Sequence, residues 1–151
     1  MPGRSGSGDP WGKLPLVVDT SAWARADRPS VRGRWLDVLL DGHRLRLSPL
    51  AREEILLSAR SGGEFDLLAE RLDTIRPAPL SATTIRAAEA GMRALAHRSA
   101  AAQRLPIVDY LIAAAAQEIG AAVLHYDRDY DTLAEVMEFE SVWLAPAGTL
   151  E

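Results

Sequence analysis

Apolar runs alternate with amphipathic stretches along this chain, and most of the runs end at a polar cluster. The first run, residues 14–19, predicts a buried strand that ends in a carboxylate, Asp19. A link containing two prolines is predicted as a short edge strand or extended segment. The full set of expected strands is 14–19, 45–48, 75–80, 121–126 and 141–144.

Apolar positions spaced three and four residues apart predict helices between these strands. Ser30 suits the N-cap of one helix and Gly42 its end, while Ser61 to Gly63 is expected to break the chain. The expected helices are 20–26, 30–40, 49–60, 64–72, 81–99, 106–119 and 130–136. The inward face of helix 81–99 is predicted to carry Ile85, Ala88, Met92, Leu95 and Ala96. Strands that alternate with helices indicate an α/β fold of three layers, α/β/α, with a mostly parallel central sheet.

Length and composition indicate one globular domain, since the chain has 151 residues, 48% hydrophobic and 25% charged. Residues 1–13 are rich in Gly, Ser and Pro and are predicted to be a disordered tail, which leaves 14–147 for the folded domain. No apolar run approaches the ~20 residues of a membrane span, so no membrane partner is expected. The chain has no cysteine, which excludes disulfides and thiolate catalysis and makes the cytoplasm the default location.

Acidic residues fall where this architecture gathers side chains. Asp19 ends a strand, Glu54 and Asp109 lie one turn into predicted helices, and Asp127 and Asp129 follow a second apolar strand. Each acid taken singly also suits a helix cap or the helix dipole. Ligands bind at the carboxyl ends of strands in open α/β sheets, so together the acids predict a four-carboxylate metal site with Asp129 as an accessory ligand. Oxygen ligands suit Mg²⁺ or Mn²⁺, which activate water and stabilise phosphoryl displacement, so phosphodiester cleavage is the predicted chemistry.

Other functions fit the residues less well. A net charge of −4 argues against nucleic-acid binding through bulk electrostatics, although an acidic metal site itself lowers the charge. A receiver domain needs a lysine distal to its acidic strand, whereas Lys13 precedes Asp19; a haloacid-dehalogenase-type phosphatase needs an acid where Ser21 stands. No Gly-rich phosphate loop is present. The remaining alternative is a non-catalytic protein- or RNA-binding module, and divalent-metal binding discriminates it from an enzyme.

The chain resembles PIN-domain ribonucleases of the VapC toxin type, the toxins of type II toxin–antitoxin systems. The resemblance covers residues 14–146 and rests on the order and spacing of Val18-Asp19-Thr20-Ser21, Glu54-Ile55-Leu56, Asp109-Tyr110-Leu111-Ile112 and His125-Tyr126-Asp127-Arg128-Asp129-Tyr130. It implies an endoribonuclease that uses Mg²⁺ or Mn²⁺ and cleaves RNA. The implied metal and catalytic set is Asp19, Glu54, Asp109 and Asp127, with Asp129 as a further ligand.

The resemblance also implies partners and neighbouring residues. A VapB-type antitoxin would block the acidic site with its C-terminal segment, and Trp23, Trp35 and Leu39 are its predicted docking surface. Domains of this type commonly form homodimers. The chain departs from the family at His125, where a small hydroxyl residue is common. His125 is expected to pack at the strand end beside the site, with proton transfer or substrate positioning as the alternative. Thr20 and Ser21 are candidates for positioning substrate or water through their hydroxyls, although local capping suits at least one of them.

Overall fold

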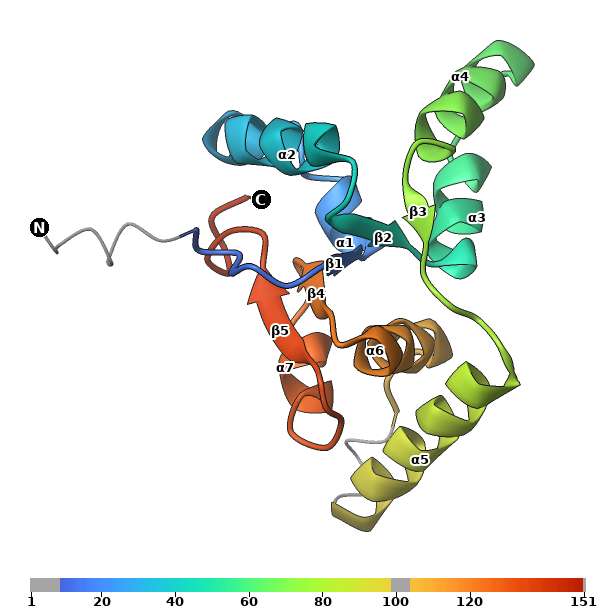
Figure 1. Ribbon diagram of the computed structural model, residues 1–151, viewed down its shortest axis with the longest axis vertical. Coiled ribbons are helices and arrows are strands. Elements are labelled where there is room, and N and C mark those ends of the chain that lie inside the picture. Colours follow the sequence, from blue (N-terminus) through green and yellow to red (C-terminus); the bar gives the residue numbers. More distant parts are fainter. Residues whose placement is uncertain (1–8, 99–103, 151) are drawn as a thin grey trace, which may run out of the picture.

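The structure is a computed structural model that describes residues 9–98 and 104–150. Within these residues, five strands form one sheet in the order β3-β2-β1-β4-β5, and every neighbouring pair is parallel (Figure 1). The strands are β1 (Leu16–Val18), β2 (Leu45–Leu47), β3 (Arg76–Pro77), β4 (Ala122–His125) and β5 (Glu140–Trp143). The α/β prediction is confirmed, and the proline-containing β3 occupies an edge as expected.

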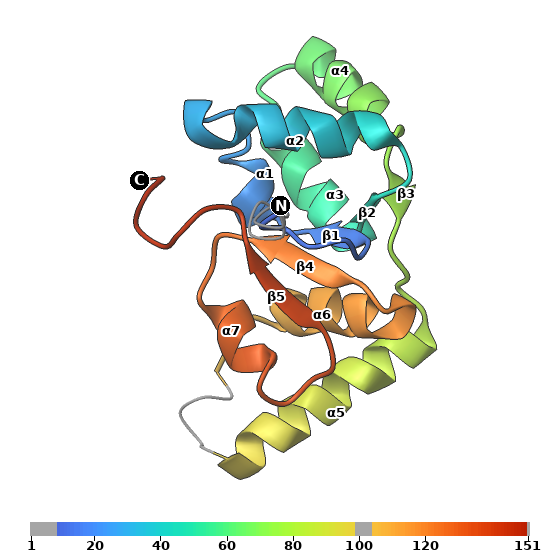
Figure 2. The ribbon, with the colours of Figure 1, turned by 60° about the vertical axis from the view of Figure 1, so that its left-hand side comes forward.

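Helices cover both sides of the sheet (Figures 1 and 2). On one side lie α1 (Thr20–Trp23), α2 (Pro29–Asp41), α3 (Pro49–Leu57) and α4 (Gly62–Leu72); on the other lie α5 (Ala82–Arg98), α6 (Ile107–Ile119) and α7 (Asp129–Leu133). The strand order explains this division, because β1 to β3 advance in one direction whereas β4 and β5 lie beyond β1 in the other. Right-handed crossovers then place the two sets of helices on opposite faces. No helix in the described ranges is long and apolar enough to cross a membrane.

Two predicted helix starts are wrong. The second helix begins at Pro29, not after Ser30, because the fixed φ of proline suits the first helical position and the extended Arg28 precedes it. The predicted break between helices includes Ser61, but this residue is the N-cap of α4. Its hydroxyl accepts the Glu64 N–H at 3.0 Å. The predicted break at Gly62 therefore forms the first turn of α4. The other predicted helix ends agree with the structure to within one turn.

The buried face of α5 differs from the predicted one. Ile85 is 53% exposed and Ala96 is also exposed, so their inward placement is wrong. The buried residues are instead Thr84, Ala88, Gly91 and Leu95. The hydroxyl of Thr84 donates a 2.7 Å hydrogen bond to Glu118 of α6, so Thr84 faces α6 and the adjacent Ile85 is turned outward. The small residues at this face let α5 approach its neighbours closely, since a Cβ on Gly91 would lie 2.6 Å from the Met137 sulfur.

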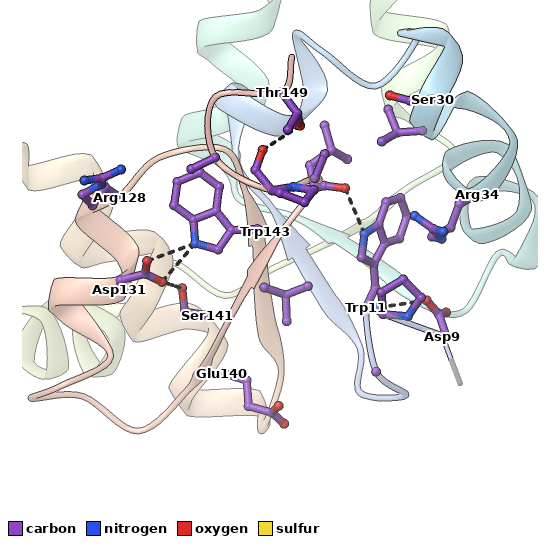
Figure 3. A pocket seen from close by; sticks show the side chains of 18 of the residues that line it. Asp9, Trp11, Ser30, Arg34, Arg128, Asp131, Glu140, Ser141, Trp143 and Thr149 are labelled. Atoms are coloured by element: carbon purple, nitrogen blue, oxygen red, sulfur yellow. Dashed lines mark hydrogen bonds between the residues drawn. The ribbon is translucent and has the colours of Figure 1, made fainter. Parts of the chain in front are cut away.

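The segment before β1 packs onto the domain. Trp11 is 1% exposed, and its indole N–H donates to the Leu144 carbonyl oxygen at 3.2 Å (Figure 3). Asp9 pairs with Arg44 at 2.9 Å. The prediction of a disordered tail is therefore wrong for residues 9–13, because one buried tryptophan outweighs the Gly- and Pro-rich composition around it. The rest of that predicted tail, residues 1–8, lies outside the described residues.

Candidate metal centre

The direction of the strand connections reverses between β1 and β4, at their carboxyl ends. Successive connections leave this point in opposite directions, which makes it the switch point where open α/β sheets bind ligands. Asp19 directly follows β1, and Asp127 lies just beyond the end of β4. Asp109 stands in the first turn of α6, and Asp129 begins α7. Four acids from separate segments are thus directed to one edge.

Three of these acids converge closely. Asp109, Asp127 and Asp129 each offer a carboxylate oxygen, and these three oxygens lie within 4.8 Å of one another. Asp127 and Asp129 are also coupled locally, because the Asp129 N–H donates to Asp127 Oδ1 at 2.9 Å. This bond from a side chain to the backbone two residues later forms a local turn, and both carboxylates lie in the same acidic group.

Tyr130 joins Asp19 to this group. Its buried hydroxyl lies 2.8 Å from Asp19 Oδ1 and 3.3 Å from Asp109 Oδ1, so a single phenol stands between two carboxylates. The other oxygen of Asp19 accepts from the Ser21 N–H at 3.0 Å and from the Ser21 hydroxyl at 2.5 Å. Asp19 therefore serves as the N-cap of α1 while its first oxygen faces the acidic group.

Asp109 is the most perturbed carboxyl of the group. Burial, followed by the charges of Asp19, Asp127 and Asp129, raises its pKa to about 7, and the hydrogen bond from Tyr130 opposes this only in part. Burial and the charge of Asp127 also raise the pKa of Asp129. A hydrogen bond with Asp109 lowers the pKa of Asp129 in part, and this bond is available only while one of the two acids holds a proton.

The donor set fits a hard divalent cation. Asp109 Oδ2 is buried and has no hydrogen-bond partner among residues 9–98 and 104–150, a costly arrangement for a carboxylate. The carboxylate oxygens beside it repel one another unless a positive charge or a proton lies between them. Oxygen ligands of this kind are those that Mg²⁺ and Mn²⁺ prefer.

Comparisons with known proteins agree with this arrangement. The profile of the PIN domain matches residues 16–136. Ribonuclease VapC18 of Mycobacterium tuberculosis is 41% identical over 89% of this chain and 98% of its own length. The chain belongs to the VapC family of PIN domains. Ribonuclease VapC51 of the same organism is 36% identical over 91% of this chain and 98% of its own length. A crystal structure of DNA-bound VapBC from Salmonella typhimurium shares the fold, with a TM-score of 0.65 and 15% identity over 88% of this chain and 100% of that chain.

Glu54 lies at the rim of the acidic group in this PIN domain. It is exposed on α3 and does not belong to the three converging acids. Its Oε1 accepts a 3.2 Å hydrogen bond from the hydroxyl of Thr20, the residue that follows Asp19. The structure thus brings the four predicted aspartates together and links Glu54 to them through Thr20.

Two predicted substrate-positioning residues have internal partners instead. His125 is fully buried, which agrees with packing at the strand end beside the site and does not support the alternative of substrate contact. Burial also lowers its pKa to about 4, although Asp131, Asp19 and Asp127 oppose the shift. The hydroxyl of Ser21 donates to Asp19 and accepts the Tyr126 N–H at 2.9 Å, which ties α1 to the end of β4.

Sequence reasoning missed Tyr130. It stands in the motif that carries Asp127 and Asp129, but its aromatic ring suggests only core packing. The available signal is its position one helical turn after Asp127, which turns its hydroxyl toward the same group.

Proposed function

We propose that this PIN domain is a metal-dependent endoribonuclease and the toxin of a VapBC-type toxin–antitoxin system. The names of its relatives support ribonuclease activity. The single observation that carries the metal-dependent part is the buried, unpartnered Oδ2 of Asp109 beside the carboxylates of Asp127 and Asp129. The proposed cytoplasmic location rests on the sequence alone.

The proposed ligands are Asp19, Asp109, Asp127 and Asp129, and the proposed ion is Mg²⁺ or Mn²⁺ because every donor is a carboxylate oxygen. When bound, such an ion acts as a Lewis acid that activates water and offsets the charge developing on a phosphate.

Neighbouring side chains orient the proposed metal ligands. Tyr130 fixes one oxygen of Asp19, and Ser21 fixes the other. In the metal-free domain the pKa of Asp109 is about 7, and its carboxyl would lose the proton on binding a cation. Thr20 and Glu54 lie at the accessible rim, so they are the members of the set that an RNA strand would meet first.

Cleavage of total cellular RNA by purified, antitoxin-free protein tests this proposal. New 5′ ends, read by sequencing, should appear with Mg²⁺ or Mn²⁺ and disappear with a chelator. Asp127→Asn should reduce cleavage by at least about 100-fold, as expected for loss of a metal ligand. Asp37→Asn, an equal change at an exposed position on α2, should leave cleavage unchanged.

Full cleavage in the chelator, or by Asp127→Asn, would contradict the proposal. A folded wild-type protein that neither cleaves RNA nor binds Mn²⁺ would instead support the non-catalytic binding module. Discrete ends would also identify the RNA and the cleavage sequence.

The proposed antitoxin site is a groove beside α2. It encloses about 570 Å³ and is lined by Trp23, Ala26, Asp27, Arg32, Trp35, Leu36, Leu39, Arg71 and Thr74. The rings of Trp23 and Trp35 meet edge to face at 5.7 Å and form an apolar floor. An apolar floor with charged residues around it suits an amphipathic segment of a VapB-type antitoxin.

Two leucines on the same helix test this docking site. Leu36 lines the groove and is 40% exposed, whereas Leu40 is 82% exposed and does not line it. Leu36→Asp should weaken binding of the cognate antitoxin at least about tenfold, and Leu40→Asp should not. Equal affinities for both variants would contradict the assignment. The proposed homodimer is tested separately by light scattering of the antitoxin-free protein.

A further inference from the structure

A chain of hydrogen bonds runs from the acidic group to the outer edge of the sheet. The Asp127 N–H donates to His125 Nδ1 at 3.1 Å. His125 Nε2 lies 2.7 Å from the Ser141 hydroxyl, and that hydroxyl donates to Asp131 Oδ1 at 2.7 Å. Figure 3 shows the outer end of this chain, where Ser141 and Trp143 on β5 turn toward Asp131 on α7. We call His125, Ser141 and Asp131 the relay.

The direction of these hydrogen bonds fixes the state of the imidazole. His125 Nδ1 accepts a backbone N–H, so it carries no proton, and the ring is neutral with its proton on Nε2. Nε2 therefore donates to the Ser141 oxygen, whose own proton is donated to Asp131. Every donor in the relay points the same way, and such chains strengthen each member through polarisation.

This order of partners excludes a nucleophilic triad. In a Ser-His-Asp triad, the hydroxyl donates to the imidazole and the carboxylate holds the opposite ring nitrogen. Here the carboxylate of Asp131 accepts the hydrogen bond of the Ser141 hydroxyl. The other ring nitrogen of His125, Nδ1, accepts the backbone N–H of Asp127. The relay therefore orients groups and does not activate the serine.

The surroundings make the relay rigid. The ring of His125 lies between Tyr130 and Trp143, with centroid separations of 4.9 Å and 5.0 Å. The Trp143 indole N–H also donates to Asp131, at 3.0 Å from Oδ2. At the inner end, Asp127 Oδ1 accepts the N–H of Asp129, and the Asp127 N–H donates to His125, so the relay is linked to both residues.

We propose that His125, Ser141 and Asp131 are positioning residues that set Asp127 and Asp129 for binding a divalent cation. This inference rests on the proposed function, since it assigns a structural cause to the geometry of the same site. Residues that orient ligands from behind contribute strongly to metal sites, and their loss commonly weakens affinity by about 10–100-fold.

Ser141→Ala tests the relay at its centre, because it removes the acceptor of the His125 proton. Two-dimensional NMR of ¹⁵N-histidine-labelled, metal-free protein reports the tautomer of this ring. The wild-type protein should hold the proton on Nε2. Ser141→Ala should keep this tautomer, because the Asp127 N–H still occupies Nδ1, but the Nε2 resonance should shift because its proton loses its acceptor. Mn²⁺ affinity, measured by calorimetry without RNA, should fall about tenfold. Ser141→Thr keeps the hydroxyl and suits a strand, so it should restore both properties.

A second variant and a control complete the test. Asp131→Ala, at an exposed position, removes the last acceptor and should reproduce both effects if Ser141→Ala folds poorly. Thr149→Ala removes a hydroxyl that donates to the Pro146 carbonyl and has no bond to the relay, so it should alter neither property.

An unchanged Nε2 resonance in both variants, or unchanged Mn²⁺ affinity in both, would overturn the inference. A wild-type protein that bound no Mn²⁺ would contradict the proposed function together with the positioning role. Failure of the relay alone would leave wild-type binding intact, so the two failures are distinguishable.

Discussion

Tyr130 places a single hydroxyl between two buried carboxylates. A phenol has one proton to donate, and the shorter contact, 2.8 Å, is the one to Asp19. Both carboxylates raise the pKa of Tyr130, as burial does, so this side chain stays protonated and remains a donor. The site thus contains a fixed donor that orients Asp19 whether or not a cation is bound.

Removal of this hydroxyl should weaken cation binding. Tyr130→Phe leaves the Asp19 and Asp109 oxygens without their shared donor, so Mn²⁺ affinity should fall about tenfold, as for other groups that orient metal ligands. Calorimetric titration with Mn²⁺ measures this directly. The matched control is Tyr126→Phe, which removes a hydroxyl that accepts the Leu150 N–H away from the acids. Equal losses in the two variants would indicate a general packing effect instead.

The raised pKa of Asp109 makes stability depend on pH. Its folded pKa of about 7 exceeds the ordinary value of 3.8, so between these values the folded state binds more protons than the unfolded state. This contribution is fully present below pH 3.8 and is lost as the pH rises through about 7. Asp109→Asn has no carboxyl that can ionise, so the stability lost on ionisation is retained. In EDTA the substitution should raise the free energy of unfolding by about 2–4 kcal/mol at pH 8 and by much less at pH 5.

Urea unfolding of wild type and Asp109→Asn at both pH values measures this difference. An equal effect of the substitution at pH 5 and pH 8 would show that the carboxyl does not titrate between them.

At the scale of elements, glycines at two positions should respond oppositely to alanine. Gly120 ends α6 with φ of +67°, a conformation that costs alanine about 1 kcal/mol. Gly33 lies inside α2, with nothing within 4 Å of an added Cβ, so alanine should stabilise that helix by about 0.5–1 kcal/mol. Thermal unfolding of the two variants gives the signs. A lower melting temperature for Gly33→Ala would contradict the helix argument.

The periodicity of apolar residues predicts most helices and strands here. A helix buries residues three and four positions apart, whereas a strand appears as a short apolar or alternating run. The positions of the strands along the chain and the last turn of α6 at Gly120 follow from such local signals. The rotation of α5 does not, because 84-88-91-95 and 85-88-92-95 are both helical stripes. The bond between Thr84 and Glu118 on another helix decides between them. Burial of Trp11 likewise depends on the distant carbonyl of Leu144.

At the scale of the whole molecule, the acidic group depends on the topology of the sheet. Asp19 and Asp109 are far apart in the chain, and they meet because β1 and β4 are neighbours and α6 precedes β4. The sequence predicts the shared edge because strand ends in α/β sheets lie together. It could not predict that three aspartates converge while Glu54 stands at the rim, since this depends on where α3 packs.

Anomalous diffraction from Mn²⁺ in crystals of the wild-type protein tests the central claim most directly. A peak should lie at direct ligand distance, about 2.0–2.6 Å, from Asp109 Oδ2 and from oxygens of Asp127 or Asp129. Crystals of Asp109→Asn under the same conditions should lose it. A peak elsewhere on the protein, or one that persists in Asp109→Asn, would contradict the assignment of this acidic group as the metal site.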